Sequence, residues 1–539
     1  MHLSLFRSGS QVFFLSFAFA LLLSPTTGTA SKRCIQSLAE LAVFQHLSAS
    51  VASWAIPEKT KLTPIKEDFL NRLHRSGAAI VTNGGSSFST LLPGTRASAK
   101  LYFKESPASV DELVKRIADS LEPALKSLAK GDVVKSREPL ILLFPAPGLT
   151  HDKKTITLPS NFGKLAGQSP NLAELVPAEL SRRARVLGIP KEQLKLSFVH
   201  VDNDILPIAA NIGQKYMKPG EHGVIYFVGT GTGSGKAAVD AVRGFEVRAL
   251  EEGHLLLDQF PTVQKQVPDH IRLGSMIAEA KDGSSASAKL ELENISGGGR
   301  VTDSLTGARS HLGGANTVAL NYLFKKVEEI PQWILKKGGD TTVLKKRFME
   351  SLGFKNEEEL KKLLESSPAD RELFEQVKQS GSLGTFEISQ AADRGSSIAE
   401  KIISDNTYSQ ALVGGVIALN VGQTPAGRPA TAKWLFENAK NGKYNISFYP
   451  RASDGLSSWA QKYIGRARQG LNDAKNLLFQ DVSYVRRLTE EGYGAVRADQ
   501  VSIDLKPVVP ESDLHPDFSG LDYVAEQMRN NLRRASVEP

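Results

Sequence analysis

A single cysteine, Cys34, occurs among the 539 residues. One thiol cannot form an intrachain disulfide, and it cannot supply the paired thiolates of a cysteine-built zinc site. The chain has no basic stripe interleaved with aromatic residues, and its net charge of +8 is modest for this length. It also has no internal repeat of solenoid period. These absences exclude a disulfide-stapled fold, predict that no structural zinc is bound, and give no support to a nucleic-acid partner.

Long apolar runs are rare, and the clearest one lies near the N-terminus. Residues 12–23 are apolar except for Ser16, Arg7 is the only Lys or Arg among the first thirty residues, and Ala30 offers a small cleavage-site residue. The run is too short to span a bilayer comfortably. We therefore expect a signal peptide over residues 1–30 and an exported protein, periplasmic or secreted. The alternative is an uncleaved anchor, the only case in which we expect a membrane partner.

Composition and pattern predict a large α/β protein. Hydrophobic content of 41% and charged content of 23% are typical of globular chains, and the length suffices for two domains or one two-lobed enzyme. Apolar β-branched runs alternate with helical patterns, which favours α/β lobes with parallel or mixed sheets. We expect strands over 139–144, 196–201, 224–228 and 445–450, a strand–turn–strand over 77–94, and helices over 31–75, 110–128, 171–188, 315–380, 387–404, 406–420 and 456–479. Ser109 and Glu112 predict a capping box at the start of helix 110–128.

The strand 224–228 runs into a loop in which glycine alternates with threonine or serine. Four glycines can approach a ligand closely, so the loop is either a phosphate loop or a Gly-rich hairpin turn. It is not a Walker loop, because Gly235-Lys236 is followed by Ala237. It is not a dinucleotide fingerprint either, because Ser234 stands at the third glycine position.

Several further motifs occur in a fixed order along the chain. Taken alone, an Asn-Asp pair after a strand is usually a turn or cap, and a Glu-x-x-His is usually a solvated helix start. The ordered series comprises Gly84-Gly85-Ser86, Phe144-Pro145-Ala146-Pro147-Gly148, Leu158-Pro159-Ser160-Asn161, Asn203-Asp204, Gly229-Thr230-Gly231-Thr232-Gly233, Glu251-Glu252-Gly253-His254, Ser296-Gly297-Gly298-Gly299 and the helical residues 388–395. In this order and spacing, residues 77–420 resemble hexokinases and the glucokinase-type ROK sugar kinases.

The resemblance implies the two-lobed, ribonuclease H-like fold of actin-like ATPases, with a cleft between the lobes. It implies a small α/β lobe over 76–204 and a large α/β lobe over 205–490 with a helical insertion around 340–380. A helical N-terminal extension over 31–75 would precede the lobes, and a C-terminal tail over 491–539 would follow them.

The same resemblance implies that ATP, Mg²⁺ and a hexose are the ligands, and it is compatible with a homodimer. Asp204 would be the general base. Sugar contacts would come from Asn161, Asn203, Asp204, Glu251, His254 and Glu293, although Glu293 stands one residue closer to Ser296 than the family pattern has it. Phosphate contacts would come from Gly84, Gly85, Ser86, Gly229, Thr230, Gly231, Thr232 and Gly233.

Three departures from the family pattern keep more than one function open. Thr82 stands where the first phosphate loop has an aspartate, and Ser89 where it has an arginine. The cysteine-rich zinc loop is missing, and the adenosine-side Gly-Gly has only poor counterparts at 414–415 and 451–455. The sequence thus predicts either an ATP-dependent hexose kinase or an exported, catalytically impaired relative that binds a sugar or another ligand. A third reading is an unrelated exported protein whose Gly loops are only turns.

Overall fold

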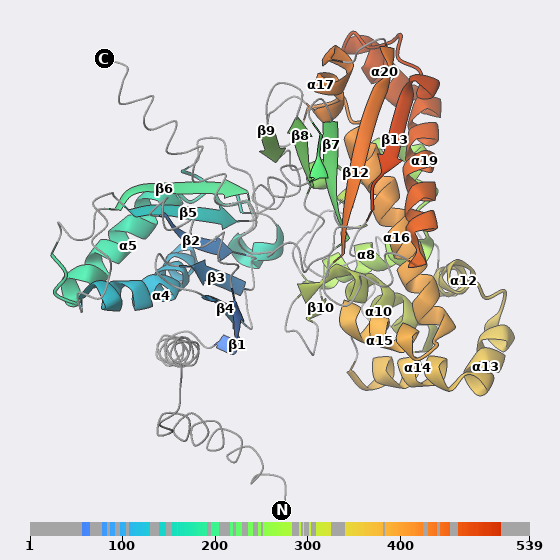
Figure 1. The fold of residues 1–539 in the computed structure, drawn as a ribbon. Coiled ribbons are helices and arrows are strands. Elements are labelled where there is room, and N and C mark those ends of the chain that lie inside the picture. Colours follow the sequence, from blue (N-terminus) through green and yellow to red (C-terminus); the bar gives the residue numbers. More distant parts are fainter. Residues whose placement is uncertain are drawn as a thin grey trace, which may run out of the picture.

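The computed structural model describes part of the chain. The described residues are 57–64, 78–83, 87–91, 97–103, 107–129, 140–146, 154–158, 160–165, 167–190, 196–203, 216–218, 222–228, 236–240, 246–249, 252–282, 290–292, 295, 301–302, 309–324, 340–380, 383–423, 430–438, 442–452 and 462–507. They form two separate sheets, each accompanied by helices (Figure 1). The predicted α/β class is confirmed.

The first sheet has six strands in the order β1-β4-β3-β2-β5-β6. The central strand β2 pairs antiparallel with β3 and parallel with β5. β4 and β1 extend the antiparallel side, and β6 extends the parallel side. The strands are β1 (Pro57–Pro64), β2 (Ala78–Asn83), β3 (Ser87–Leu91), β4 (Ala97–Phe103), β5 (Leu140–Ala146) and β6 (Leu196–Asn203).

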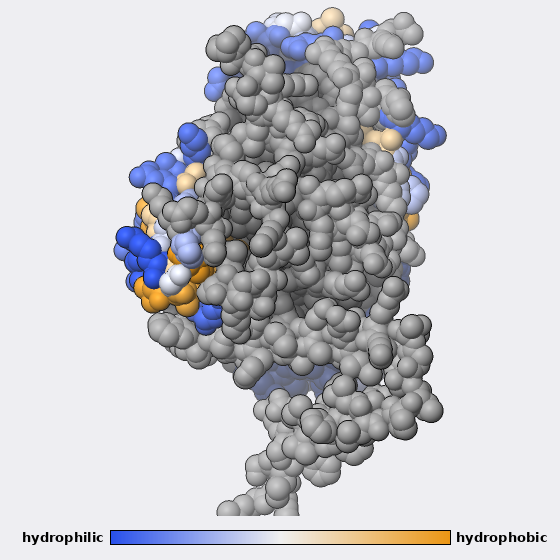
Figure 2. Space-filling model, turned by 60° about the vertical axis from the view of Figure 1, so that its left-hand side comes forward, coloured by the Kyte–Doolittle hydropathy of each residue, from blue (hydrophilic) through white to orange (hydrophobic). Residues whose placement is uncertain are grey.

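Two helices, α4 (Val110–Ala129) and α5 (Leu172–Val186), pack on each other and against this sheet. The predicted N-cap of α4 is confirmed, because Ser109 Oγ accepts from the backbone N of Glu112 at 3.1 Å. The reciprocal bond of the predicted capping box is displaced by one residue, since Glu112 accepts from Ala108 N at 2.8 Å. Buried side chains of α4 and α5 form one core with Phe162 of the short helix η1 (Ser160–Leu165). We call this sheet with α4 and α5 the first lobe. On the coloured part of the surface in Figure 2, hydrophilic side chains lie beside a smaller group of apolar ones.

The second sheet repeats the same plan with five strands in the order β13-β12-β7-β8-β9. Its central strand β7 pairs antiparallel with β8 and parallel with β12. β9 continues the antiparallel side and β13 the parallel side. The strands are β7 (His222–Val228), β8 (Lys236–Asp240), β9 (Glu246–Ala249), β12 (Tyr444–Ala452) and β13 (Val501–Leu505), and a separate two-stranded ribbon joins β10 (Val301–Thr302) to β11 (Arg309–Ser310).

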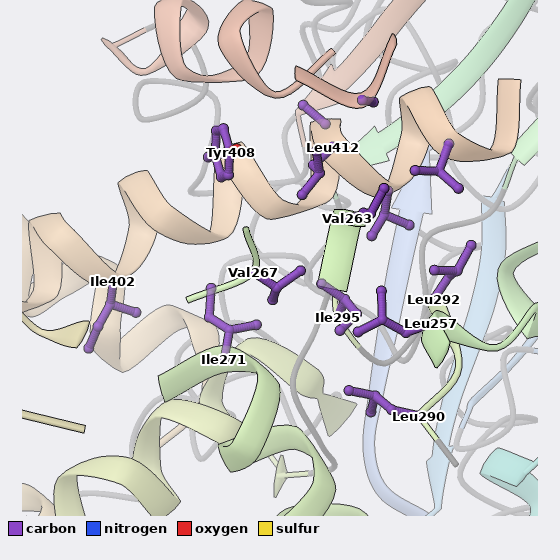
Figure 3. Close-up of a cluster of buried hydrophobic side chains, with 14 of the residues drawn as sticks. Leu257, Val263, Val267, Ile271, Leu290, Leu292, Ile295, Ile402, Tyr408 and Leu412 are labelled. Atoms are coloured by element: carbon purple, nitrogen blue, oxygen red, sulfur yellow. The ribbon is translucent and has the colours of Figure 1, made fainter. Parts of the chain in front are cut away.

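Helices dominate the rest of this second lobe. They are α7 (Pro261–Gln264), α8 (Asp269–Asp282), α10 (His311–Phe324), α12 (Thr341–Ser351), α13 (Glu357–Ser366), α14 (Pro368–Ser380), α15 (Thr385–Asp393), α16 (Ser397–Ala418), α17 (Thr431–Asn438), α19 (Ile464–Gln480) and α20 (Val482–Glu490). α16 is buried along most of its length and packs against β7 and α19. Ile402 and Leu412 of α16 face Val263, Val267 and Ile271 in the core (Figure 3). Within the described residues, no helix has the length and apolarity needed to cross a bilayer.

The predicted helical extension is wrong over residues 57–64, which form the edge strand β1. The alternation of Lys and Thr in this segment suits an extended strand, and its two prolines lie at the strand ends, where a missing N–H is tolerated. The remaining part of the predicted extension, residues 31–56 and 65–75, lies outside the described residues.

Two predicted boundaries also differ from the structure. The break expected near residue 405 lies at 394–396, because Gly395 ends α15 with φ of +90° and Ser396 caps α16. β13 lies inside the predicted C-terminal tail but pairs in parallel with β12, so the second lobe extends at least to Leu505. The helical segment expected around 340–380 is present as α12, α13 and α14.

Candidate functional site

The polar motifs of the first lobe gather at one edge of its sheet. β2, β5 and β6 are parallel, so their carboxyl ends meet at the same edge. The connection from β2 to β3, which holds Gly84, Gly85 and Ser86, leaves at this edge. Ala146 pairs with Asn203, so the segments that follow β5 and β6 leave there side by side. The described strand ends Asn83, Ala146 and Asn203 therefore lie at one edge of the sheet, while residues 84–86 and 147–148 lie outside the described residues.

The second sheet has the same arrangement at the carboxyl ends of β7 and β12. Val228, the last residue of β7, pairs with Ala452, the last residue of β12. The Gly-rich connection over residues 229–235 leaves β7 here and joins it to β8 as an antiparallel hairpin, with Lys236 opposite Tyr226. β7 and β8 thus stand in the same relation as β2 and β3, whereas residues 229–235 and 84–86 themselves lie outside the described residues. The 451–455 segment also leaves at this edge.

Most of the predicted site residues lie outside the described residues. These are Asp204, Glu251, Glu293, Gly84, Gly85, Ser86, Gly229, Thr230, Gly231, Thr232 and Gly233. Asn203 ends β6, and Asn161 lies in η1. His254 ends the short helix η2 (Glu252–His254), which comes shortly after β9. The sugar and phosphate roles of all these residues stay predictions, as does the cleft between the lobes.

The structure adds one residue that the sequence did not single out, Glu252. Glu252 is 1% exposed. Its Oε1 accepts a hydrogen bond at 3.2 Å from Nδ2 of Asn420, a residue that lies just beyond the end of α16. Asn420 Oδ1 in turn accepts from Gly422 N. This hydrogen bond therefore attaches the turn that contains Gly253 and His254 to the buried end of α16. The pair of acids at 251–252 was the only sequence signal, and periodicity could not tell which of the two is buried.

Gly415, the second glycine of the pair at 414–415, has a packing role. Both lie within α16, and a Cβ added to Gly415 would stand 2.6 Å from the Cβ of Ala474 in α19. The missing side chain lets the two helices approach closely. The adenosine-side correspondence of this pair, like that of residues 451–455, stays a prediction.

The first phosphate loop lacks two charged residues of the family pattern. Mg²⁺ prefers carboxylate oxygens in octahedral geometry. Thr82 and Ser89 stand opposite each other on β2 and β3, and neither carries a charge. Among the described residues, no group of three or more His, Cys, Asp or Glu side chains could hold a metal ion.

Sequence comparisons found no matching family model and no matching curated protein. Solved structures similar to the chain include the hexokinase of Schistosoma mansoni with glucose, at 13% identity and a TM-score of 0.40, covering 89% of this chain and 99% of that one. A ROK family glucokinase of Streptomyces griseus with glucose and AMPPNP has 15% identity and a TM-score of 0.37, covering 84% and 99%. The ROK hexokinase of Thermus thermophilus has 12% identity and a TM-score of 0.32, covering 83% and 98%. The ordered motifs of the sequence resemble these same families of sugar kinases.

Proposed function

We propose that the chain is a hexose kinase of the glucokinase type, exported by its N-terminal segment, in which ATP and a hexose meet between the lobes. One observation carries this proposal: the repeated strand order brings the Gly-rich connection of each sheet to the carboxyl edge of its central strand. In the first sheet the same edge holds Asn203, which directly precedes Asp204. Ligands of α/β sheets bind outside such edges.

Asp204 has the chemistry that the reaction needs. A carboxylate accepts the proton of the attacking sugar hydroxyl while the γ-phosphoryl group is held in line. Asn203 and Asn161 would bind neighbouring hydroxyls from the first lobe, and Glu251, His254 and Glu293 from the second. A site that pairs buried groups with hydroxyls rejects sugars that lack them.

Glu252 would act as a positioning residue in this site. Its hydrogen bond with Asn420 holds the turn on which His254 lies, so that a sugar contact from this turn has a fixed direction. Side chains that are held in place before the ligand arrives lose less conformational entropy when it binds.

A second candidate function is sugar binding without phosphorylation, performed by an exported relative of the sugar kinases. Thr82 and Ser89 favour this reading, because both replace charged residues of the family's phosphate loop. ATP is also scarce outside the cell. The two candidates share the sugar site and differ in whether the phosphoryl group is transferred.

Calorimetric titration of the chain beginning at Ser31 with hexoses, amino-hexoses and Mg-ATP tests the proposal, followed by an ADP-release assay on any sugar that binds. A kinase releases ADP, and Asp204→Asn abolishes release while sugar binding persists. Asp111→Asn, a change of an exposed acid in α4, is the matched control and leaves release unchanged. Sugar binding without ADP release supports the binding relative, and absence of sugar binding rules out both.

A further inference from the structure

A short antiparallel bridge lies next to the turn at residues 252–254. Residues 255–257 and 290–292 pair through two backbone hydrogen bonds of 2.8 and 2.7 Å. In the sequence, His254 directly precedes one side of this bridge and Glu293 directly follows the other. The bridge therefore links the two segments from which the sugar contacts of the second lobe are expected.

The bridge and the end of α16 belong to one hydrophobic core. Leu257 and Leu292 are buried in the same core as Leu412 of α16 (Figure 3). Beyond the end of this helix, Asn420 uses both polar atoms of its side chain, because Nδ2 donates to Glu252 and Oδ1 accepts from the next turn of backbone. The placement of Asn420 therefore decides where the turn at Glu252 is held.

Tyr484 of α20 holds the peptide group that leads into Asn420. The last carbonyl groups of a helix have no partner within the helix. At the end of α16, the carbonyl oxygen of Leu419 accepts a hydrogen bond from Tyr484 Oη at 2.7 Å. Tyr484 is 1% exposed, and burial raises the pKa of its hydroxyl, so the hydroxyl remains protonated and continues to donate.

The first turn of α20 also holds the segment that follows the bridge. Asp481 caps this helix, because its Oδ1 accepts from the backbone N of Ser483 at 2.9 Å and of Tyr484 at 3.3 Å. Its Oδ2 accepts from Thr262 Oγ1 of α7 at 2.9 Å. The segment 252–262 is thus tied to α20 at its far end through Asp481, and at its near end through the end of α16.

We propose that Tyr484 and Asn420 are positioning residues for the hexose, and that the first turn of α20 sets how firmly the segment 252–257 is held for binding. The contacts run from Tyr484 to the Leu419–Asn420 peptide, and from Asn420 to Glu252. If the turn samples other positions, the apparent Kd rises in inverse proportion to the fraction of molecules in which it is in place. The inference rests on the proposed function in one respect, because the ligand of the turn is taken to be a hexose.

Tyr484→Phe tests the inference, because it removes the hydroxyl and keeps the ring. In a hexose titration of the full chain, the net worth of one hydrogen bond predicts a rise in Kd of about threefold to tenfold. Tyr408→Phe is the matched control. Tyr408 Oη donates to Asp473 Oδ2 at 2.9 Å in the middle of the same helix, so its loss lowers the free energy of unfolding and leaves the Kd unchanged. An unchanged Kd in Tyr484→Phe, or an equal rise in both variants, contradicts the inference.

Amide hydrogen exchange of the protein without ligand gives a readout that does not need hexose binding. The N–H groups of Leu257 and Leu292 donate the two hydrogen bonds of the bridge. In Tyr484→Phe these two amides exchange faster by about threefold or more, because the segment opens locally more often. Asn420→Asp replaces the donor with a carboxylate and has a larger effect, whereas Tyr408→Phe has none. Unchanged exchange in Tyr484→Phe and Asn420→Asp overturns the inference.

The two measurements together separate this inference from the proposed function. Hexose binding that does not depend on Tyr484 overturns the inference and leaves the sugar site standing. If wild type binds no hexose while the exchange of Leu257 and Leu292 depends on Tyr484, the proposed function is overturned and the role of Tyr484 in holding the turn is upheld.

Discussion

His270 is a fully buried histidine at the start of α8, and it links three helices. Its Nδ1 lies 2.6 Å from Ser351 Oγ, and its Nε2 lies 3.8 Å from Asp405 Oδ2 in α16. Burial lowers the pKa of His270 to about 4, so the ring is neutral at neutral pH and its contact with Asp405 is not an ion pair. Asp405 forms its ion pairs with Lys401 and Arg466 instead.

The buried histidine predicts a loss of stability in mild acid. The folded-state pKa lies below the ordinary value of 6.5, so the unfolded chain binds the proton more readily. The free energy of unfolding therefore falls as the pH drops from about 6.5 toward 4, by about 3 kcal/mol in total. Urea unfolding of wild type and His270→Asn across this range measures it. In the variant, the free energy of unfolding should depend much less on pH over this range. If wild type and variant show parallel pH profiles, other groups cause the loss of stability.

At the scale of secondary-structure elements, glycines let helices α16 and α19 pack closely against each other. A Cβ on Gly470 would stand 2.9 Å from Leu412 N and even nearer to the carbonyl oxygen of Tyr408. Because these are backbone atoms, a methyl group there forces the helices apart. Gly465 lies in the same helix, and nothing stands within 4 Å of an added Cβ.

This difference gives a matched pair of substitutions. Gly470→Ala should lower the free energy of unfolding by about 1–3 kcal/mol through overpacking. Gly465→Ala should leave it unchanged or raise it by about 0.5 kcal/mol, because alanine restricts the unfolded chain. Chemical denaturation of both variants measures the effect. If the two variants are equally stable, close packing does not set the spacing of these helices.

Elements with strong local signals were predictable from the sequence, and those that depend on distant partners were not. The cap at Ser109 and the apolar strand before Pro147 follow from local chemistry. The break before α16 does not, because Asp370 of α14 stabilises it from a distance by accepting hydrogen bonds from Ser396 Oγ at 2.6 Å and Ile398 N at 3.0 Å. β1 was missed for the same reason, since its pairing partner β4 comes later in the chain.

Among the described side chains, those of the first lobe and those of the second lobe form separate hydrophobic cores. In the first lobe, Arg183 of α5 forms ion pairs with Asp119 and Glu122 of α4 and with Glu179. Hydrogen bonds from Arg182 and Arg183 lower the pKa of Glu179 to about 2. Arg183 thus joins the two helices of this lobe.

We expect the molecule to unfold in two steps, the first transition being that of the first lobe and the second that of the second lobe. Arg183→Gln should lower only the first transition, because it leaves the half-buried Asp119 without its cation, at a cost of about 3 kcal/mol. Gly470→Ala should lower only the second. Differential scanning calorimetry of both variants tests this assignment. A single transition that shifts in both variants would show that the lobes unfold as one unit.

At the scale of the whole molecule, the order of motifs predicted the α/β class, and the registers then showed how the motifs meet. Spacing along the chain put Thr82 near a Gly-rich turn. Only the pairing of strands showed that the carboxyl ends of β2, β5 and β6 share one edge, because long segments separate these strands along the chain. The side chains of Asp204 and Glu251 lie outside the described residues, so their roles stay predictions.

The repeated strand order has a consequence for biosynthesis, because the chain emerges N-terminus first. The first sheet is complete once Asn203 has appeared. The second sheet begins with its central strand β7, and the parallel neighbour β12 starts only at Tyr444. At 5–20 residues per second, one edge of β7 waits roughly 10–40 s for its partner. The apolar residues that make β7 a good core strand therefore also expose it to chaperones and to mispairing during synthesis.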